Sequence, residues 1–305
     1  MKKILLGLVC AAALMGAGLM SATWAADIKV INADVWFPEG PIWYQGKLYY
    51  VEYGRNTIMT WDGTKNDTFW KQDGCGPSAV VTNAAGQFLT TCYDSGTIGR
   101  ISADGKTLTP YSKDSNGHGF VGPNDLAPDK KGGVYFTGSG HEGPAIDASA
   151  YYINKDGTTV TQVADDLHNA NGLAVSNDGK TLYVIETEEN RLLQFAINED
   201  GTLTDRKVFL NLTDLFPKDP KIWPDGVKID AKGELYIGQS PRSLDAPGKI
   251  IVVDGAGKLL RTIAVPSVSM PNLAFGPDEK VIYVMALDQI DKAPWHGKVY
   301  EVPNQ

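Results

Sequence analysis

The chain contains six similar segments in series, and this internal repeat constrains its fold more than any other feature. Each segment opens with a turn of small residues or proline, a polar residue and a short apolar strand; an Asp, Asn or Gly turn then leads into a second strand. Successive segments begin about 40 to 55 residues apart, a spacing that suits a four-stranded unit with its connections. The polar residues that open the six segments are Glu39, Ser78, Asn124, Asn171, Asp225 and Asn272.

The repeated segments predict an all-β protein. Their second strands, such as Thr181–Ile185 and Glu234–Gly238, alternate with period two, and no long segment has the period of a helix. Six repeats of this length predict a six-bladed β-propeller with four-stranded blades. A strand at Ile28–Asn32 is expected to pair with Lys298–Val302 and so close the ring. The alternative fold, a β-sandwich with an added domain, would not explain six similar segments.

Residues 1–25 have the features of a secretory signal peptide that is removed on export. Two lysines begin the segment, an apolar run extends from Ile4 to Met20, and small residues end at Ala25 or Ala26. The apolar run is shorter than the roughly 20 residues of a membrane-spanning helix. The sequence therefore predicts a periplasmic or secreted bacterial protein whose mature chain, residues 26–305, forms a single domain.

The charge of the chain restricts its partners. The formal net charge is −8, and loss of Lys2 and Lys3 with the signal peptide makes it −10. An acidic surface repels phosphate backbones and anionic lipid heads, so we expect no nucleic acid and, after signal cleavage, no membrane partner. We expect a monomer that acts on a small molecule.

Two cysteines, Cys75 and Cys92, remain after signal cleavage. In an oxidising compartment they can pair. If they flank a hairpin centred on residues 82–86, Cys75 falls opposite residue 94, slightly offset from Cys92. A disulfide and two reduced, partly buried thiols are equally compatible with this register. Zinc-ligand spacing is absent, because two cysteines and four scattered histidines form no recognisable set.

The six opening residues predict a metal site. In a propeller they lie around the axis at one end of the central tunnel, where they form a ring of two carboxylates, three carboxamides and one hydroxyl with no cation. Two acids facing each other across a tunnel repel unless a positive charge lies between them. Oxygen donors of this kind suit Ca²⁺ best, with Mg²⁺, Mn²⁺ or Zn²⁺ as alternatives. The predicted ligands are Glu39, Asn124, Asn171 and Asp225.

A structural role is the competing interpretation of the same ring. Asn and Asp are common where a turn leads into a strand, because they tolerate unusual backbone angles and bond to nearby amides. A water-filled tunnel without metal could arise from that preference alone. Glu39 argues against it, since Glu has little value in turns.

The chain resembles a known family at four of the six positions. The matching motifs, in order, are Glu39-Gly40-Pro41, Pro123-Asn124-Asp125, Asn171-Gly172 and Pro224-Asp225-Gly226. They are similar to those of the senescence-marker-protein/gluconolactonase/luciferin-regenerating-enzyme (SGL) family, and the resemblance runs from about Glu39 to Val302.

The resemblance implies a six-bladed propeller that hydrolyses a lactone. It also implies that Glu39, Asn171 and Asp225 bind a divalent cation and that Asn124 lies at the metal or the substrate. A related branch, the diisopropyl-fluorophosphatases, hydrolyses organophosphates on a similar four-residue calcium site. The chain departs from the sugar-lactone members at Gly122, where they carry Arg, and in the segment 136–140, where many bacterial members read Phe-Thr-Asp-Pro.

These observations lead to a mechanistic hypothesis. A metal-dependent lactonase, an esterase-type hydrolase, would polarise the lactone carbonyl on its cation, with Asp225 as the general base for the attacking water. Asn124, Asn272 and His141 are the predicted substrate-binding residues, although the loop position of His141 by itself favours an exposed histidine without such a role. Trp223 could form an apolar substrate wall or simply pack in the core. A non-catalytic, calcium-braced periplasmic binding propeller and an organophosphate hydrolase are the alternatives.

Overall fold

The structure, a computed structural model, describes residues 27–141, 146–217, 222–241 and 248–304. Most of these residues lie in β-strands, which confirms the all-β prediction. The helical segments of the described ranges are α1 (Leu212–Leu215) and two single 3-10 turns, η1 (Tyr53–Arg55) and η2 (Pro277–Glu279). The predicted signal peptide, residues 1–25, lies outside the described residues and stays a prediction.

Sixteen of the strands form four separate sheets, each with four antiparallel strands in sequence order. The first two sheets contain β2 (Pro38–Tyr44), β3 (Lys47–Glu52), β4 (Thr57–Trp61) and β5 (Asn66–Lys71), then β6 (Pro77–Thr82), β7 (Phe88–Cys92), β8 (Thr97–Ile101) and β9 (Thr107–Tyr111). The next two contain β10 (Pro123–Pro128), β11 (Val134–Gly138), β12 (Ala148–Ile153) and β13 (Val160–Leu167), then β14 (Ala170–Val175), β15 (Thr181–Glu186), β16 (Arg191–Ile197) and β17 (Leu203–Asn211). The prediction of four-stranded sheets is confirmed.

The remaining eight strands form one sheet of two joined groups. The groups are β18 (Ile222–Ile229), β19 (Leu235–Pro241), β20 (Lys249–Val253) and β21 (Leu259–Ile263), and β22 (Ser269–Phe275), β23 (Val281–Leu287), β24 (His296–Pro303) and β1 (Lys29–Trp36). Gln239 of β19 pairs with Met270 of β22 and joins them. Strand β1 pairs with β24, with Lys29 opposite Glu301, so the predicted pairing of the two ends of the chain is confirmed.

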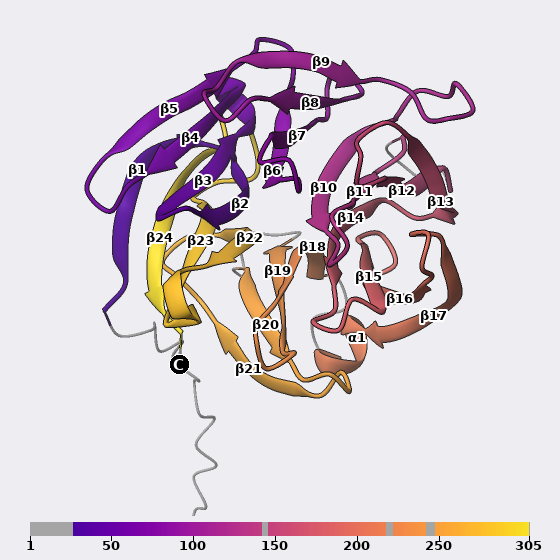
Figure 1. Ribbon diagram of the computed structural model, residues 1–305. Helices are drawn as coiled ribbons and strands as arrows, with labels where there is room; N and C mark the ends of the chain where they lie inside the picture. Colours follow the sequence, from indigo (N-terminus) through magenta and orange to yellow (C-terminus); the bar gives the residue numbers. More distant parts are fainter. Residues whose placement is uncertain (1–26, 142–145, 218–221, 242–247, 305) are drawn as a thin grey trace, which may run out of the picture.

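The first strand of each group of four lies nearest the centre of the molecule (Figure 1). These inner strands are β2, β6, β10, β14, β18 and β22. Each contacts the next, and β22 contacts β2, so they close a ring. The sheets stand around this ring in a propeller-like arrangement, and the start of every inner strand is brought towards the others.

Aromatic and aliphatic side chains fill the spaces between neighbouring sheets and hold the ring together. Tyr135 of β11 and Leu173 of β14 belong to one such buried cluster, and Tyr236 of β19 and Leu273 of β22 belong to another. The hydroxyl of Tyr135 donates a hydrogen bond of 2.8 Å to the carbonyl oxygen of Gly201. A tyrosine can therefore bury its ring between sheets and still satisfy its polar end.

The structure decides between the two states left open for the cysteines. Cys75 and Cys92 form a disulfide with their Cα atoms 4.5 Å apart. The amide of Asp94 donates to the carbonyl oxygen of Cys75, so residue 75 does lie opposite residue 94 as predicted. The bond therefore runs diagonally from the segment entering β6 to the end of β7.

Candidate functional site

Each inner strand has an irregularity in its pairing at its opening polar residue or, for Glu39 and Asn272, directly beside it. The register shifts lie between Glu39 and Ile42, Pro77 and Ala79, Pro123 and Leu126, Ala170 and Leu173, Pro224 and Val227, and Ser269 and Asn272. A bulge leaves residues without a cross-strand partner and re-aims their side chains. The same device is therefore repeated around the ring at the positions that the sequence singled out.

Glycines next to the polar residues allow neighbouring inner strands to approach closely. A Cβ atom on Gly172 would lie 2.3 Å from the carbonyl oxygen of Asp225, and one on Gly226 would lie 2.2 Å from Cγ of Asn272. At both distances an added side chain would force its neighbour to move. The Asn-Gly and Asp-Gly pairs at 171–172 and 225–226 thus combine a ligand-type side chain with a close strand contact.

Two carboxylates of the ring lie close together on strands β2 and β18. Glu39 is buried, with 7% of its surface exposed. Its Oε2 atom accepts hydrogen bonds from the amide of Gly40 at 2.6 Å and from Nδ2 of Asn272 at 2.9 Å. The side chain of Asn171 donates to the carboxylate of Asp225. The structure thus pairs Glu39 with Asn272 and Asn171 with Asp225, and the charge of Asp225 acts on Glu39.

The environment of the two acids disfavours their negative charges. Burial, followed by the charge of Asp225, raises the pKa of Glu39 well above its ordinary value, although the bonds from Gly40 and Asn272 oppose this. Burial, followed by the charge of Asp125, raises the pKa of Asp225 to about 7 against the bond from Asn171. Enclosed acids that repel one another are the electrostatic signature of a site that is completed by a cation.

The ring differs on the side of β6 and β10. The hydroxyl of Ser78 lies 2.8 Å from the carbonyl oxygen of Asn124, which also accepts a bond of 2.7 Å from the hydroxyl of Thr91. Nδ2 of Asn124 donates to the hydroxyl of Ser139 at 3.1 Å. These polar groups therefore join neighbouring sheets, and the amide of Asn124 has a protein partner as well as a position in the ring.

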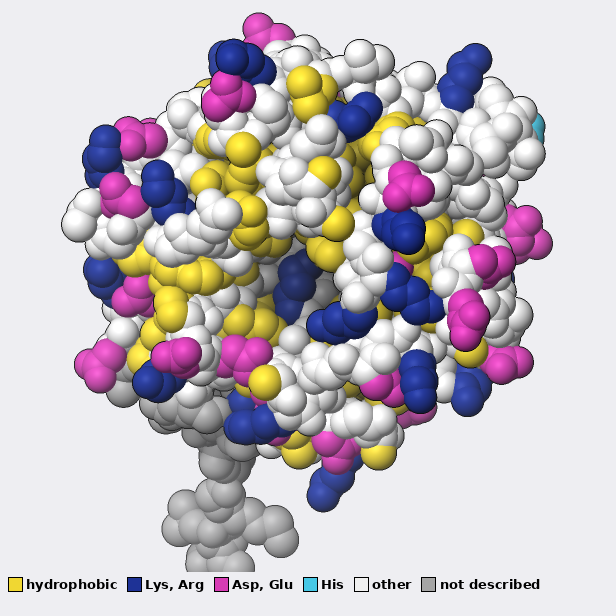
Figure 2. All heavy atoms as spheres, viewed as in Figure 1, with side chains coloured by type: hydrophobic (Ala, Val, Ile, Leu, Met, Phe, Trp, Pro, Cys, Tyr) yellow, Lys and Arg dark blue, Asp and Glu magenta, His cyan; other side chains and the backbone are white. Residues whose placement is uncertain are grey.

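Two further charged residues, Asp125 and Lys228, were missed in the sequence. The Lys228 ammonium lies 3.3 Å from Oδ2 of Asp125, and the two side chains are 20% and 3% exposed. A hollow at the centre of one face contains Lys or Arg side chains, dark blue in Figure 2. A sequence signal for Lys228 exists: the third residue after each of the other five opening residues is apolar, namely Ile42, Val81, Ala127, Ala174 and Phe275.

The donor set of the ring fits a hard divalent cation. Among the described residues, no three His, Cys, Asp or Glu side chains converge as a metal cluster. The candidate set is of another kind, because it mixes the two acids Glu39 and Asp225 with the amides of Asn124 and Asn171. Carboxylate and amide oxygens are the ligands that Ca²⁺ accepts, and a cation between the acids would offset the burial and repulsion that raise their pKa values.

His141 lies in the loop after β11, and Trp223 lies at the start of β18. The His141 side chain is 70% exposed, and its Nδ1 contacts the carboxylate of Asp147 instead of a ring residue. The next residues, 142–145, lie outside the described part of the chain. Trp223 precedes Pro224 at the start of β18 and is half-buried.

A cluster of half-buried aromatic rings lies beside the segments that enter β2 and β10. Phe37 and Tyr53 have ring centroids 5.6 Å apart, and Trp295 lies 5.6 Å from Phe37. Tyr93 is 6.5 Å from Tyr53. A Cβ atom on Gly122 would lie 3.0 Å from the Tyr93 ring, so this ring covers the backbone two residues before Asn124. We call Phe37, Tyr53, Tyr93 and Trp295 the aromatic wall.

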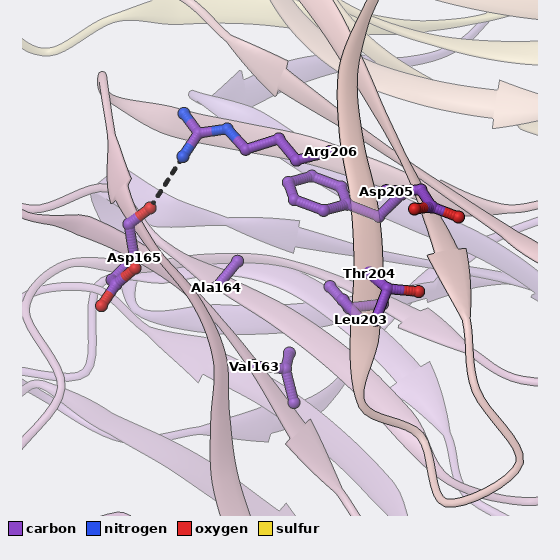
Figure 3. A pocket seen from close by; sticks show the side chains of 8 residues that line it. Val163, Ala164, Asp165, Leu203, Thr204, Asp205 and Arg206 are labelled. Atoms are coloured by element: carbon purple, nitrogen blue, oxygen red, sulfur yellow. Dashed lines mark hydrogen bonds between the residues drawn. The ribbon is translucent and has the colours of Figure 1, made fainter.

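Another hollow of about 200 Å³ lies between β13 and β17. These are the fourth strands of their sheets, whereas the inner strands are the first. Val163, Leu203 and Arg206 are among its lining residues (Figure 3). The guanidinium of Arg206 donates to the carbonyl oxygen of Asp165 at 3.1 Å. This hollow contains none of the ring residues and is separate from the candidate site.

Sequence comparison relates most of the chain to one family. The model of the SMP-30/Gluconolactonase/LRE-like region matches residues 37–288. Lactonase drp35 of Staphylococcus saprophyticus is 29% identical over 229 residues, which cover 73% of this chain and 67% of that protein. Lactonase drp35 of Staphylococcus haemolyticus is 28% identical over 229 residues, which cover 64% of its length. The matched region thus spans about two thirds of these relatives.

Solved structures show the same fold. A gluconolactonase from Xanthomonas campestris superimposes with a TM-score of 0.74 at 24% identity, covering 90% of this chain and 89% of that chain. The calcium-binding protein regucalcin from Agrobacterium tumefaciens superimposes with a TM-score of 0.73 at 20% identity, covering 90% and 92%.

Proposed function

Since the chain belongs to the SMP-30/gluconolactonase/LRE-like family, we propose that it is a divalent-cation-dependent hydrolase that opens a lactone ring. The six groups of four strands would be the blades of a six-bladed propeller, with the site at one mouth of its tunnel. The lactonases and gluconolactonase among its relatives support this reaction class.

One observation carries the proposal: two enclosed carboxylates on separate strands, Glu39 and Asp225, repel each other and are held by amide side chains. A purely structural ring has no need for such a pair, because repulsion between buried acids costs stability. The calcium-binding regucalcin structure shares the fold and supports Ca²⁺ as the first candidate, ahead of Mg²⁺, Mn²⁺ and Zn²⁺.

The ring residues would have separate roles in lactone hydrolysis. A divalent cation bound by Glu39, Asn124, Asn171 and Asp225 supplies Lewis acidity towards the lactone carbonyl and lowers the pKa of water. Asp225 accepts the proton of the attacking water, and the amide of Asn171 keeps its carboxylate in position.

The remaining contacts orient the ligands, and the later steps of hydrolysis follow from the attack of water. The hydrogen bonds from Gly40 and Asn272 fix the orientation of the Glu39 carboxylate. After Asp225 has taken a proton from the water, the water oxygen adds to the carbonyl carbon, the ring C–O bond breaks, and the leaving alkoxide takes that proton from Asp225 to give a hydroxy acid.

The aromatic wall points to the kind of lactone. Phe37 directly precedes β2, and Tyr93 covers Gly122 two residues before Asn124, so the wall adjoins the segments that enter two of the inner strands. Stacked rings provide a large apolar contact area. We therefore propose lactones with an apolar or aromatic portion as better substrates than sugar lactones.

The disulfide supports the proposed export. A bond between Cys75 and Cys92 persists in the periplasm or outside the cell, whereas the cytosol keeps thiols reduced. Cell fractionation with thiol counting on the isolated protein tests this. Two free thiols in a cytoplasmic fraction would contradict it.

The function itself is tested with a lactone panel. Purified protein is assayed on alkyl, aromatic and sugar lactones with a pH indicator, before and after chelation and with Ca²⁺ restored, while elemental analysis determines the bound metal. We expect turnover that is lost on chelation and restored by Ca²⁺. The Glu39→Gln/Asp225→Asn double variant should be inactive, and the exposed pair Glu199→Gln/Asp200→Asn is its matched control. Chelator-insensitive turnover, or turnover by the double variant, would contradict the proposal.

A further inference from the structure

The ion pair between Lys228 and Asp125 joins strands that are not neighbours in the ring. Lys228 belongs to β18 and Asp125 to β10, and β14 lies between them with contacts to both. An ammonium 3.3 Å from the Asp125 carboxylate must therefore reach it through the interior of the ring. Lys228 thus places a positive charge inside the ring itself.

Asp125 adjoins the candidate site. It follows the predicted ligand Asn124 on β10, and Lys228 follows the predicted ligand Asp225 by three residues on β18, so the ion pair joins two strands that carry predicted ligands. One Asp125 oxygen accepts the amide of Leu126 at 2.7 Å, and the other faces Lys228. By formal charge, the carboxylates of Glu39, Asp225 and Asp125 and the Lys228 ammonium sum to two negative charges, which one divalent cation balances.

The pair has no obvious value for folding alone. A nearly buried ion pair is often no more stable than apolar side chains of similar volume, because both charges lose their hydration. The other five segments carry apolar residues at the position of Lys228. A lysine in this one segment therefore calls for a role that an apolar residue could not supply.

We propose that the Lys228 ammonium is a permanent positive charge in the tunnel. It neutralises Asp125 and so limits the number of divalent ions that the ring can bind to one. The ion itself rests on the proposed function, whereas the neutralisation of Asp125 does not. Without Lys228, the Asp125 carboxylate keeps the bond from the Leu126 amide but loses its counter-charge, and it becomes available to a second cation or strengthens the binding of the first.

The experiment measures calcium stoichiometry and affinity by calorimetric titration and equilibrium dialysis of the mature protein after chelation. Lys228→Met removes the charge at similar length, Lys228→Arg keeps it, and Lys106→Met is an exposed control. We expect one ion for the wild type and the Arg variant. The Met variant should bind a second ion, or bind its single ion about tenfold more tightly or better. One ion held within threefold of the wild-type affinity would overturn the proposal.

Thermal melting in chelator separates this inference from the proposed function. Without divalent ions, Lys228→Met should melt several degrees below the wild type, and adding Asp125→Asn should recover most of the loss. If the wild type binds no ion, the metal-dependent function fails, but this melting pattern still supports Lys228 as the tunnel cation. Equal melting of all three proteins would refute it. If Lys228→Met does not fold, rescue by Asp125→Asn supports the same conclusion, and failure of that rescue contradicts it.

Discussion

The two sides of the ring use equivalent positions of the repeat for different purposes. On the side of β6 and β10, Ser78 and Thr91 direct their hydroxyls to the backbone carbonyl of Asn124 and so tie one sheet to the next. On the side of β2, β18 and β22, burial raises the pKa values of Glu39 and Asp225, and so does a neighbouring carboxylate, that of Asp225 for Glu39 and that of Asp125 for Asp225.

The comparison teaches how to separate structural from chemical residues in a repeated fold. A polar side chain whose hydrogen bonds end on a neighbouring strand has a structural role that accounts for it. An enclosed carboxylate beside another one destabilises the protein, so its presence points to a functional role. The predictions below test whether this division is correct.

The largest effect is expected from Asp225→Asn, on the side of β2, β18 and β22. Loss of the proposed general base should lower kcat/KM for lactone hydrolysis by about 100-fold to 10,000-fold, because proton transfer by a positioned side chain contributes that much. Steady-state kinetics at saturating Ca²⁺ measure it, with Asp200→Asn as the exposed control. A variant that kept both its metal and its full rate would show that Asp225 is not the base.

A pH dependence of stability is the next largest effect. The folded pKa of Asp225 is about 7, above the unfolded value of about 3.9, so the folded form holds this proton more tightly. The resulting contribution is complete below about pH 4 and is lost as the pH rises through about 7, with an upper bound of about 4 kcal/mol.

Urea unfolding in chelator between pH 5 and pH 8 checks this dependence. The free energy of unfolding of the wild type should fall relative to that of Asp225→Asn as the pH rises, and Ca²⁺ should reduce the difference. Parallel pH profiles for the two proteins would mean that Asp225 is not perturbed.

Glu39→Gln should act mainly on the cation. Removing one negative ligand is expected to weaken Ca²⁺ binding by about 100-fold, since even changes among groups around metal ligands cost 10-fold to 100-fold. Calorimetric titration measures the affinity, with Glu199→Gln as the exposed control. Unchanged affinity would remove Glu39 from the ligand set and weaken the contrast between the two sides.

The smallest effect is expected from Ser78→Ala, on the side of β6 and β10. The Asn124 carbonyl keeps the bond from Thr91, so unfolding should become easier by only about 1 kcal/mol. Activity should stay within about threefold of the wild type, in contrast to the Asp225 variant. A loss of activity as large as that of Asp225→Asn would show that the two sides do not differ as described.

Much of the fold was predictable because its signal is local and repeated. Alternation with period two and hairpin turns recur along the chain, so four-stranded sheets followed from short segments such as Thr181–Ile185. The convergence of Glu39, Asn171, Asp225 and Asn272 was also within reach, because a repeat that closes on itself brings equivalent positions together.

The sequence by itself therefore determined the strands, their grouping and the residues at the start of each inner strand. Only the tertiary structure decided that Cys75 bonds with Cys92, that Lys228 pairs with Asp125, and which polar groups of the ring are engaged by neighbouring backbone. The physical reason is that these contacts depend on distances of a few ångströms between strands far apart in the chain. Local propensity and spacing carry no information about such distances, whereas packing around the closed ring sets them.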